Sequence, residues 1–445
     1  MTLLRAVSGV SAIDELLSDE ALVASMVTVE TALVHAAERA GVVPAGVADQ
    51  VDRAVAGHDV DPEALAGASL SAGNPVVPLV KELLGLVPAE ARPWVHHGAT
   101  SQDVLDTALM LRAAEVSDLA ADRLGVARDA AAALARRHRA DPQIGRTLGQ
   151  HAVPTTFGVV AAGWAVGLDA ARRELRRARA ALAVQLGGAA GTLGVYGGAG
   201  PDVVTALADE LGLVVPAVPW HTDRTRVRCL AAALGSVTVA AGKVATDVVG
   251  LSASEVGEVA EGGGAGHGGS SAMPHKRNPV RSVLVRGAAI RAPGLAATVL
   301  AAGLQEHQRA VGAWHAEWEP LLELLSLAGG AADRIADVLA GLSVDTARMA
   351  ATLEAARPAV MAEQLTTVLK PQLGRAEAQR LVGDAVTAGD DDAVVARVLR
   401  GTGGTGGTGG EDELRAALDP RSSLEACGAI VDAALAEIAR PDTEA

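Results

Sequence analysis

The chain has 445 residues, enough for two or three domains around a substantial core. A formal net charge of -15 and an aromatic content of only 2% disfavour nucleic-acid binding, which needs basic surface and stacking platforms. Cys229 and Cys427 are the only cysteines and lack metal-ligand spacing, which argues against a disulfide framework and a structural zinc site. We expect both to be buried small hydrophobic residues in a reducing compartment.

Targeting and membrane signals are weak. The first apolar stretch is too short, and followed too soon by Asp14 and Glu15, for a signal peptide, so we expect a cytoplasmic protein. The longest uncharged stretches, 147–168 and 180–201, are interrupted by polar residues, proline or glycines. We therefore expect no membrane span.

The first clear helix begins at Asp19, which we interpret as its N-cap, and ends before Gly41 and Pro44. Apolar residues recur along it at helical spacing and form one stripe: Leu22, Met26, Val29, Leu33 and Ala37. Similar patterns predict long helices over 107–138, 155–183, 227–257 and 279–301.

Strand signals are scarce, so the predicted class is all-α. Long helices cannot bury their apolar stripes in a small globule, which favours a bundle that subunits can share. We expect three helical domains: an N-terminal domain over 1–105, a central long-helix domain over 106–353, and a small C-terminal domain over 354–445. The Gly/Thr run from Gly401 to Gly410 predicts a flexible surface linker without a function of its own.

The strongest chemical signal is GGGAGHGGSSAMPHKRNPVRS, from Gly262 to Ser282. Its Gly/Ser-rich first half cannot hold a helix and predicts a mobile loop, whereas Pro274 and Pro279 stiffen the second half. Such a segment suits a closing lid that brings together a serine and an anion clamp. The stiff half presents His275, Lys276, Arg277 and Asn278.

Other meanings of glycine-rich loops fail on pattern. The phosphate-binding motif GxxxxGK[ST] is absent, and a GxSxG nucleophile elbow is excluded because Ala272 occupies the second glycine position. A second glycine-rich stretch, 187–200, follows an arginine-rich helical pattern rather than a strand, so we interpret it as a turn and not as a dinucleotide fingerprint.

Three segments, in the expected order, resemble the conserved regions of the fumarase/aspartase superfamily: HHGATSQDVLDTAL over 96–109, GRTLGQHAVPTTFG over 145–158, and GSSAMPHKRNP over 269–279. The resemblance implies an all-helical, cofactor-free and metal-free homotetramer with a twenty-helix core. It also implies active sites built from three subunits, which eliminate or add back a group β to a carboxylate.

The resemblance implies a role for each matching residue. Ser270 would exchange the proton α to a substrate carboxylate, activated by desolvation, backbone N–H groups and a nearby cation, because free serine is a weak base. Lys276 and Asn278 would bind that carboxylate, and Thr100 and Ser101 a second one. Thr147, Gln150 and His151 would lie close by. For His97, His275 and Arg277 a functional and a structural role stay equally open, whereas for Arg146, Arg281 and His267 we favour a structural one.

Departures from the pattern separate the branches of the superfamily. In adenylosuccinate lyase, the position of Leu148 is a histidine general acid and the position of Val283 is its supporting glutamate, so this chain lacks both. Asn74 also replaces a histidine, and QEHQRAVGAWHAEW over 305–318 replaces a phosphate-gripping segment. In that segment Trp314, His315 and Trp318 either shape a pocket or belong to the core.

Residues 305–318, together with SAGNPVVPL over 71–79 and ATSQDVLDTA over 99–108, resemble the bacterial 3-carboxymuconate lactonizing enzymes. That resemblance implies intramolecular addition of a carboxylate to a conjugated double bond of a small anionic polycarboxylate, in the protocatechuate branch of the β-ketoadipate pathway. Such a reaction needs no general acid for an amine. Two alternatives remain: a related lyase, adenylosuccinate lyase-like or releasing nitrite from nitrosuccinate, and a non-catalytic structural member. The intact Ser270, Lys276 and Asn278 argue against the last.

Overall fold

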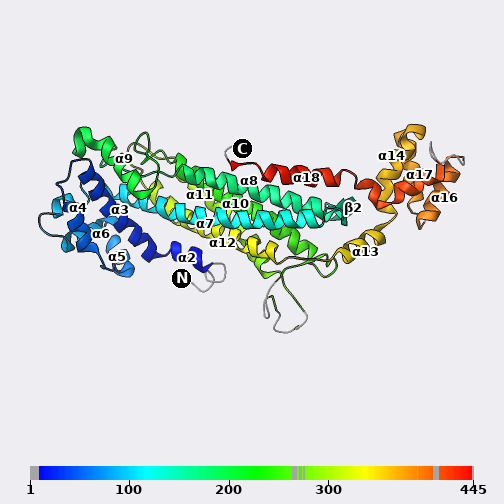
Figure 1. The fold of residues 1–445 in the computed structure, drawn as a ribbon, viewed down its shortest axis with the longest axis horizontal. Helices are drawn as coiled ribbons and strands as arrows, with labels where there is room; N and C mark the ends of the chain where they lie inside the picture. The colour runs from blue at the N-terminus through cyan, green and yellow to red at the C-terminus, as the bar shows by residue number, and fades with distance from the viewer. Residues whose placement is uncertain are drawn as a thin grey trace. The chain divides into compact units, whose positions relative to one another are not determined.

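The computed structural model describes residues 10–262, 268–269, 273, 276–387, 389–403 and 410–442. It is mostly helical (Figure 1). The N-terminal part contains α2 (Ser11–Leu16), α3 (Asp19–Arg39), α4 (Val47–Val55), α5 (Pro62–Ser69), α6 (Val76–Leu86) and the 3-10 turn η1 (Arg92–Trp94). The long helices are α7 (Ser101–Arg137), α8 (Phe157–Ala180), α10 (Thr225–Leu251), α11 (Val280–Ala302) and α12 (Ala313–Ala340), with η2 (Gly194–Ala199) and α9 (Gly200–Leu211) between α8 and α10.

The C-terminal part consists of short helices: α13 (Thr346–Ala356), η3 (Ala359–Met361), α14 (Ala362–Leu373), α15 (Arg375–Ala385), α16 (Asp391–Gly401), α17 (Gly410–Leu418), η4 (Pro420–Ser423) and α18 (Cys427–Ile438). Around α14 to α17 a separate apolar cluster includes Met361, Leu365, Leu381 and Leu414. These helices therefore have a core of their own.

The chain divides into two compact units that interleave along the sequence. The first comprises 1–124, 171–242 and 284–333, and the second comprises 125–170, 243–283 and 334–445. Five helices, α7, α8, α10, α11 and α12, contribute residues to both units. Each unit therefore combines segments that are distant in the sequence, and the three helical domains stay a prediction.

Helix α3 shows how the sequence sets a helix boundary. Ser18 has extended backbone angles, and its hydroxyl accepts a hydrogen bond of 3.1 Å from the amide of Ala21. Asp19 is therefore the first helical residue and not the N-cap that the sequence suggested, because the serine already satisfies the first free N–H groups. The acidic Asp19 and Glu20 follow in the first turn, where the helix dipole favours them.

Long helices pack against one another within each unit. In the first, Arg123 of α7 pairs with Asp333 of α12 at 2.7 Å. At the α10–α11 contact a Cβ on Gly242 would lie 2.5 Å from the Cβ of Ala289, so only glycine permits this approach. In the second unit the indole N–H of Trp164 on α8 donates to Asp247 of α10 at 2.7 Å. The predicted bundle is thus confirmed as closely packed helices.

Two further expectations are wrong. The helix predicted to begin at Thr155 begins at Phe157, as α8, because the residues before it form an antiparallel hairpin of β1 (Pro142–Thr147) and β2 (Gln150–Thr156), which the sequence analysis did not predict. Cys427 is buried as expected, but Cys229 is exposed, because on α10 it points away from the buried side formed by Val227, Leu230 and Leu234. A second short ladder pairs β3 (Val259–Ala260) with β4 (Ser343–Val344).

Candidate active site

The segment before α7 is held by contacts from distant parts of the first unit. Nδ1 of His96 lies 2.6 Å from a carboxylate oxygen of the buried Glu30. The hydroxyl of Tyr196 donates a hydrogen bond to the carbonyl of His97. Gly98, at φ 75°, lies under the Tyr196 ring, which a Cβ would approach to 2.5 Å. The chain is therefore fixed where it enters the helix.

The same contacts change the proton affinity of His96. Burial alone would lower the pKa of the imidazole, but the hydrogen bond and charge of Glu30, with the charge of Asp103, outweigh burial and raise that pKa. His97 is half-buried between two rings, with centroids 5.2 Å from Trp94 and 5.8 Å from Tyr196. Its ring packing supports the structural alternative for this residue.

Thr100 and Ser101 stand at the N-terminus of α7, the 37-residue helix of the first unit. Both are half-buried, and within the described part of the chain neither hydroxyl has a hydrogen-bond partner. The N-terminal end of a helix carries partial positive charge and free N–H groups. Two free hydroxyls at this place fit the predicted binding of a carboxylate.

Asp103, in the first turn of α7, was not singled out from the sequence. Its side chain is 2% exposed. It accepts from the amides of Thr100 at 3.0 Å, Gly187 at 3.0 Å and Gly188 at 2.9 Å, and lies 2.6 Å from Nε2 of His221. One buried carboxylate thus joins three segments that are far apart in the sequence.

A second buried network lies one turn further along α7. Arg224 donates two hydrogen bonds to Asp106, at 2.7 and 3.1 Å, and also binds Glu317. Its guanidinium lies 4.8 Å from the centroid of the Trp220 ring. Burial raises the pKa of the Glu317 carboxyl to about 7. The charge of Asp106 adds to this rise, whereas the charge and hydrogen bonds of Arg224 oppose it. One buried guanidinium therefore forms ion pairs with two buried carboxylates.

The Trp-rich segment of α12 belongs mainly to this network. The indole N–H of Trp314 donates to Asp106 at 2.9 Å, and its ring packs edge-on against Trp318 with centroids 4.7 Å apart. Trp314 is buried, whereas His315 is exposed and lies 3.0 Å from the carbonyl oxygen of Gly73. Trp314 is thus a core residue, the second of the two readings left open by the sequence.

The hairpin of the second unit carries the next group of predicted site residues. Leu148 and Gly149 form its two-residue turn, with φ of 51° and 79°, the left-handed conformations that a tight hairpin requires. Thr147, Gln150 and His151 flank the turn and are exposed. Leu148 itself is fully exposed, at 102%. The hairpin tip thus presents three polar side chains around one apolar side chain.

The hairpin is anchored by Glu258, which is completely buried. Its carboxylate accepts from Arg146 at 2.6 and 3.0 Å and from the side-chain amide of Gln143 at 2.8 Å. Arg146 therefore has the structural role we favoured, although it lies in a strand and not at a helix end. Because Glu258 directly precedes β3, the anchor lies next to the start of the glycine-rich loop.

The described ends of that loop are also fixed. Glu261 accepts from the amides of Arg281 at 2.9 Å and Ser282 at 3.0 Å and so caps α11. The backbone and side-chain amides of Asn278 donate to the carbonyl of Gly268, at 2.8 and 3.1 Å. Lys276 and Arg277 are exposed. Ser270, His275 and His267 lie outside the described residues.

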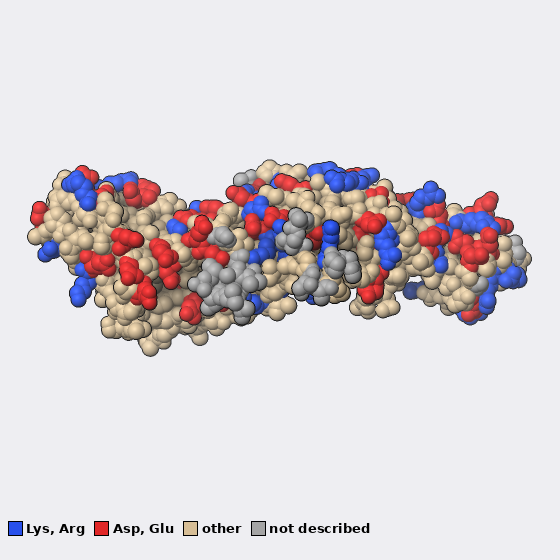
Figure 2. Space-filling view, turned by 90° about the horizontal axis from the view of Figure 1, so that it is seen from below, with Lys and Arg blue, Asp and Glu red and all other residues tan. Residues whose placement is uncertain are grey.

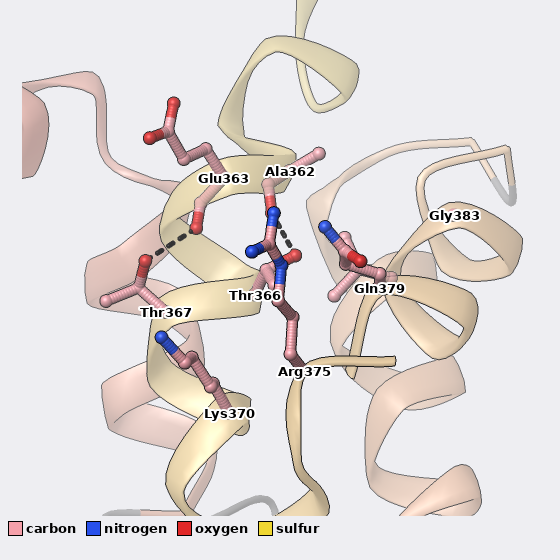
Figure 3. Close-up of a pocket in the computed structure, with 9 residues that line it drawn as sticks. Ala362, Glu363, Thr366, Thr367, Lys370, Arg375, Gln379 and Gly383 are labelled. Atoms are coloured by element: carbon pink, nitrogen blue, oxygen red, sulfur yellow. Dashed lines mark hydrogen bonds between the residues drawn. The ribbon is translucent and has the colours of Figure 1, made fainter. Parts of the chain in front are cut away.

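Described residues of the second unit line at least two cavities. One, of about 350 Å³, lies beside the hairpin and is lined by residues of β1, β2, α8 and α10, including Arg146 and Asp247. The other, of about 560 Å³, lies between α14 and α15, where Figure 3 shows Arg375 extending beside Thr366. Among the described site residues, none lines either cavity. The predicted residues thus lie at the start of α7 in the first unit, and at the hairpin tip and the end of the glycine-rich loop in the second.

Comparisons with known proteins agree with the motifs. A family model described as "Lyase" matches residues 11–294. A nitrosuccinate lyase of Streptomyces davaonensis is 44% identical, with 97% of this chain and 94% of that protein covered. A 3-carboxy-cis,cis-muconate cycloisomerase of Pseudomonas aeruginosa is 42% identical, with coverage of 94% and 93%.

The crystal structure of the 3-carboxy-cis,cis-muconate lactonizing enzyme from Pseudomonas putida superposes with a TM-score of 0.88 at 36% identity, covering 98% of each chain. The family model and the relatives each span more than half of the chain, and the helical architecture is shared along its length. The chain therefore belongs to the fumarase/aspartase superfamily, which confirms the family and the helical fold class predicted from its three motifs.

Proposed function

We propose that the protein is a 3-carboxy-cis,cis-muconate cycloisomerase, a cytoplasmic enzyme that acts on a small anionic polycarboxylate. The observation that carries this is Leu148, which projects fully exposed from the hairpin tip between Thr147 and Gln150. A leucine cannot protonate a leaving amine, so this surface suits a leaving or attacking carboxylate. Relatives with this activity, at about 40% identity over nearly the whole chain, support the same assignment.

In the proposed reaction one substrate carboxylate attacks the conjugated double bond within the same molecule. The C–O bond forms while the π electrons move onto a second carboxylate, and the α-carbon then takes a proton from Ser270. Lys276 and Asn278 stabilise the electron-rich carboxylate, and Thr100 with Ser101 binds the remaining one. Because the nucleophile is part of the substrate, positioning supplies much of the acceleration.

We further propose a homotetramer with shared active sites, built around the long helices. Three segments, Ala12–Arg39, α10 and α11, are long and apolar enough to cross a membrane by length and composition. On α11 only 28% of the most apolar stretch is buried in the single chain. Large apolar side chains are exposed on α10 and α11: Val239, Val283, Ile290 and Leu300. Such a face fits a subunit interface.

The surface itself fits a soluble assembly acting on small molecules. Figure 2 shows basic side chains interspersed with acidic ones on the face that it draws. With the net charge of -15, this distribution supports a small substrate over a nucleic-acid partner.

A second candidate is nitrosuccinate lyase, favoured by the 44% identity to the Streptomyces davaonensis protein. Here Ser270 would take the α-proton, and the C–N bond would break as nitrite leaves with the bonding electrons. Nitrite is a stable anion and needs no proton from the enzyme. The exposed Leu148 is therefore compatible with this reaction too.

One pair of assays separates the candidates. Purified protein is given 3-carboxy-cis,cis-muconate, and loss of the diene absorbance is followed; in parallel it is given nitrosuccinate, and nitrite is measured. We expect the value of kcat/KM to be at least a hundredfold higher for the muconate. A higher value for nitrosuccinate would replace the cycloisomerase assignment by the lyase.

A further inference from the structure

We infer that Asp103 is a positioning residue, which holds the Thr100–Ser101 carboxylate subsite in its binding shape. The inference rests on the proposed role of that subsite and deepens it. Asp103 does not line the subsite, because its carboxylate is buried and fully engaged within the first unit. It acts through the backbone of Thr100, the residue whose free hydroxyl is proposed to bind substrate.

The carboxylate of Asp103 lies within hydrogen-bond distance of four N–H donors. The amide of Thr100 is three residues away in the sequence, whereas Gly187, Gly188 and His221 are 84, 85 and 118 residues away. A buried acceptor with several N–H donors is worth more than one neutral hydrogen bond, and its loss leaves those donors without partners in the core. The entry to α7 thus depends on one side chain.

The turn that contains Gly187 and Gly188 packs against the segment that precedes α7. Gly188 has φ 68°, and a Cβ there would lie 2.8 Å from the carbonyl oxygen of Gly98. Arg309 closes the arrangement from the other side, donating to the carbonyl of Gly188 at 2.6 Å and to the side chain of Gln102, next to Ser101, at 2.8 Å. Asp103 therefore fixes both the subsite backbone and the turn that supports it.

Thr107 provides a matched control one turn along α7. Its hydroxyl donates to the carbonyl of Gln185 at 3.1 Å and accepts from the amide of Gln185 at 2.8 Å. It joins the same helix to the same incoming segment and is equally buried, yet its side-chain hydrogen bonds go to Gln185 and not to Thr100. A loss of general stability would affect Thr107→Val and Asp103→Asn alike, whereas a loss of positioning would affect only the latter.

The experiment uses the full-length protein and two readouts: KM of the substrate that is turned over, and calorimetric Kd of tricarballylate, a saturated tricarboxylate. Asp103→Asn replaces one acceptor oxygen by an NH2 group, which then faces N–H donors instead of accepting from them. We expect it to raise both constants at least about tenfold, the size of one lost charge-assisted hydrogen bond. Thr107→Val should leave both within about twofold. His221→Gln, which removes one of the four contacts, should give an intermediate rise and replaces Asp103→Asn if that variant does not fold.

Thr100→Val distinguishes the proposed carboxylate subsite from the proposed positioning role of Asp103. If it weakens tricarballylate binding while Asp103→Asn and His221→Gln do not, the positioning inference alone is overturned. Equal effects of Thr107→Val and Asp103→Asn would overturn it as well. If Thr100→Val itself has no effect on either constant, the carboxylate subsite is wrong and the inference falls with it. Tricarballylate binding does not depend on which reaction the enzyme catalyses.

Discussion

Arg146 binds Glu258 through two parallel hydrogen bonds of 2.6 and 3.0 Å, joining the strand that ends at the hairpin tip to the residue before β3. The acid is completely buried, so removing its partner leaves a charge in the core. Arg146→Met should therefore cost about 3–5 kcal/mol of unfolding free energy, measured by denaturant titration. Adding Glu258→Gln should recover part of that loss. A single variant with wild-type stability would show that the pair does not anchor the hairpin.

Ser270→Ala should lower turnover at least about a hundredfold while leaving the helical circular dichroism unchanged, because a positioned proton-transfer group is lost. Its neighbour provides the control, since Ser271→Ala removes the same hydroxyl one residue later. Near-wild-type rates in both variants would exclude Ser270 as the proton-transfer residue.

Adenylosuccinate and argininosuccinate should not be cleaved at a detectable rate, because Leu148 and Val283 replace the acid and its partner that an amine leaving group needs. Leu148→His combined with Val283→Glu should not create the activity, since residues 305–318 lack the phosphate-gripping pattern. Product formation is followed by fumarate absorbance. Robust cleavage of either compound by the unmodified protein would contradict the proposed function.

Mixing inactive subunits should restore activity if sites are shared between chains. The Ser270→Ala and His151→Ala proteins are denatured and refolded together in equal amounts, after His151→Ala alone is shown to be strongly impaired. When the two residues of a site come from different subunits, about a quarter of sites regain both. Activity should then exceed that of either parent. A mixture that stays at the parental average, despite demonstrated subunit exchange, would falsify the shared-site architecture.

The stability of the protein should depend on pH through Glu317. Burial raises the pKa of this carboxyl to about 7 in the folded chain, above its ordinary 4.5, so the folded state binds the proton more tightly than the unfolded state. The contribution of Glu317 to the unfolding free energy is fully present below pH 4.5 and is lost as pH rises through about 7. Relative to Glu317→Gln, wild-type stability should fall across this window, by at most about 1.4 kcal/mol per pH unit.

Thermal midpoints at pH 5, 6, 7 and 8 for wild type, Glu317→Gln and Glu363→Gln check this directly. The last variant is the control, because Glu363 is an exposed glutamate on α14. Parallel pH profiles for all three proteins would show that Glu317 does not titrate in this range.

The long helices could be predicted from the sequence because the helical spacing of apolar residues is visible within each segment alone. The pattern over 107–138 corresponds to α7, which begins at Ser101, and the pattern over 279–301 to α11, Val280–Ala302. The start of α3 was missed by one residue because serine and aspartate are both good N-caps, and only backbone geometry distinguishes Ser18 from Asp19.

The features that the sequence did not reveal depend on distant partners. Asp103 looks like an ordinary acidic residue of a first helical turn, and its donors Gly187 and His221 are more than eighty residues away. The hairpin was missed because Gly145, Pro154 and adjacent threonines disguise its alternation. A two-residue turn at Leu148–Gly149, with an uncommon left-handed leucine, carries none of the usual Asn-Gly signal.

The hairpin contains a bulge whose additional residue lies in β2, because Gly145 alone stands opposite Ala152 and Val153. The pairing shifts between Ile144 and Arg146, and at Gly145 itself a Cβ would come within 2.7 Å of the carbonyl oxygen of Val153. One additional residue in a strand reverses the side to which all later side chains point. Because the additional residue belongs to β2, deleting Ala152 would reverse the side to which Gln150 and His151 point relative to Pro154. The direction in which Gln150 and His151 point at the hairpin tip thus depends on one additional residue of β2, and Gly145 leaves room for it on the opposite strand.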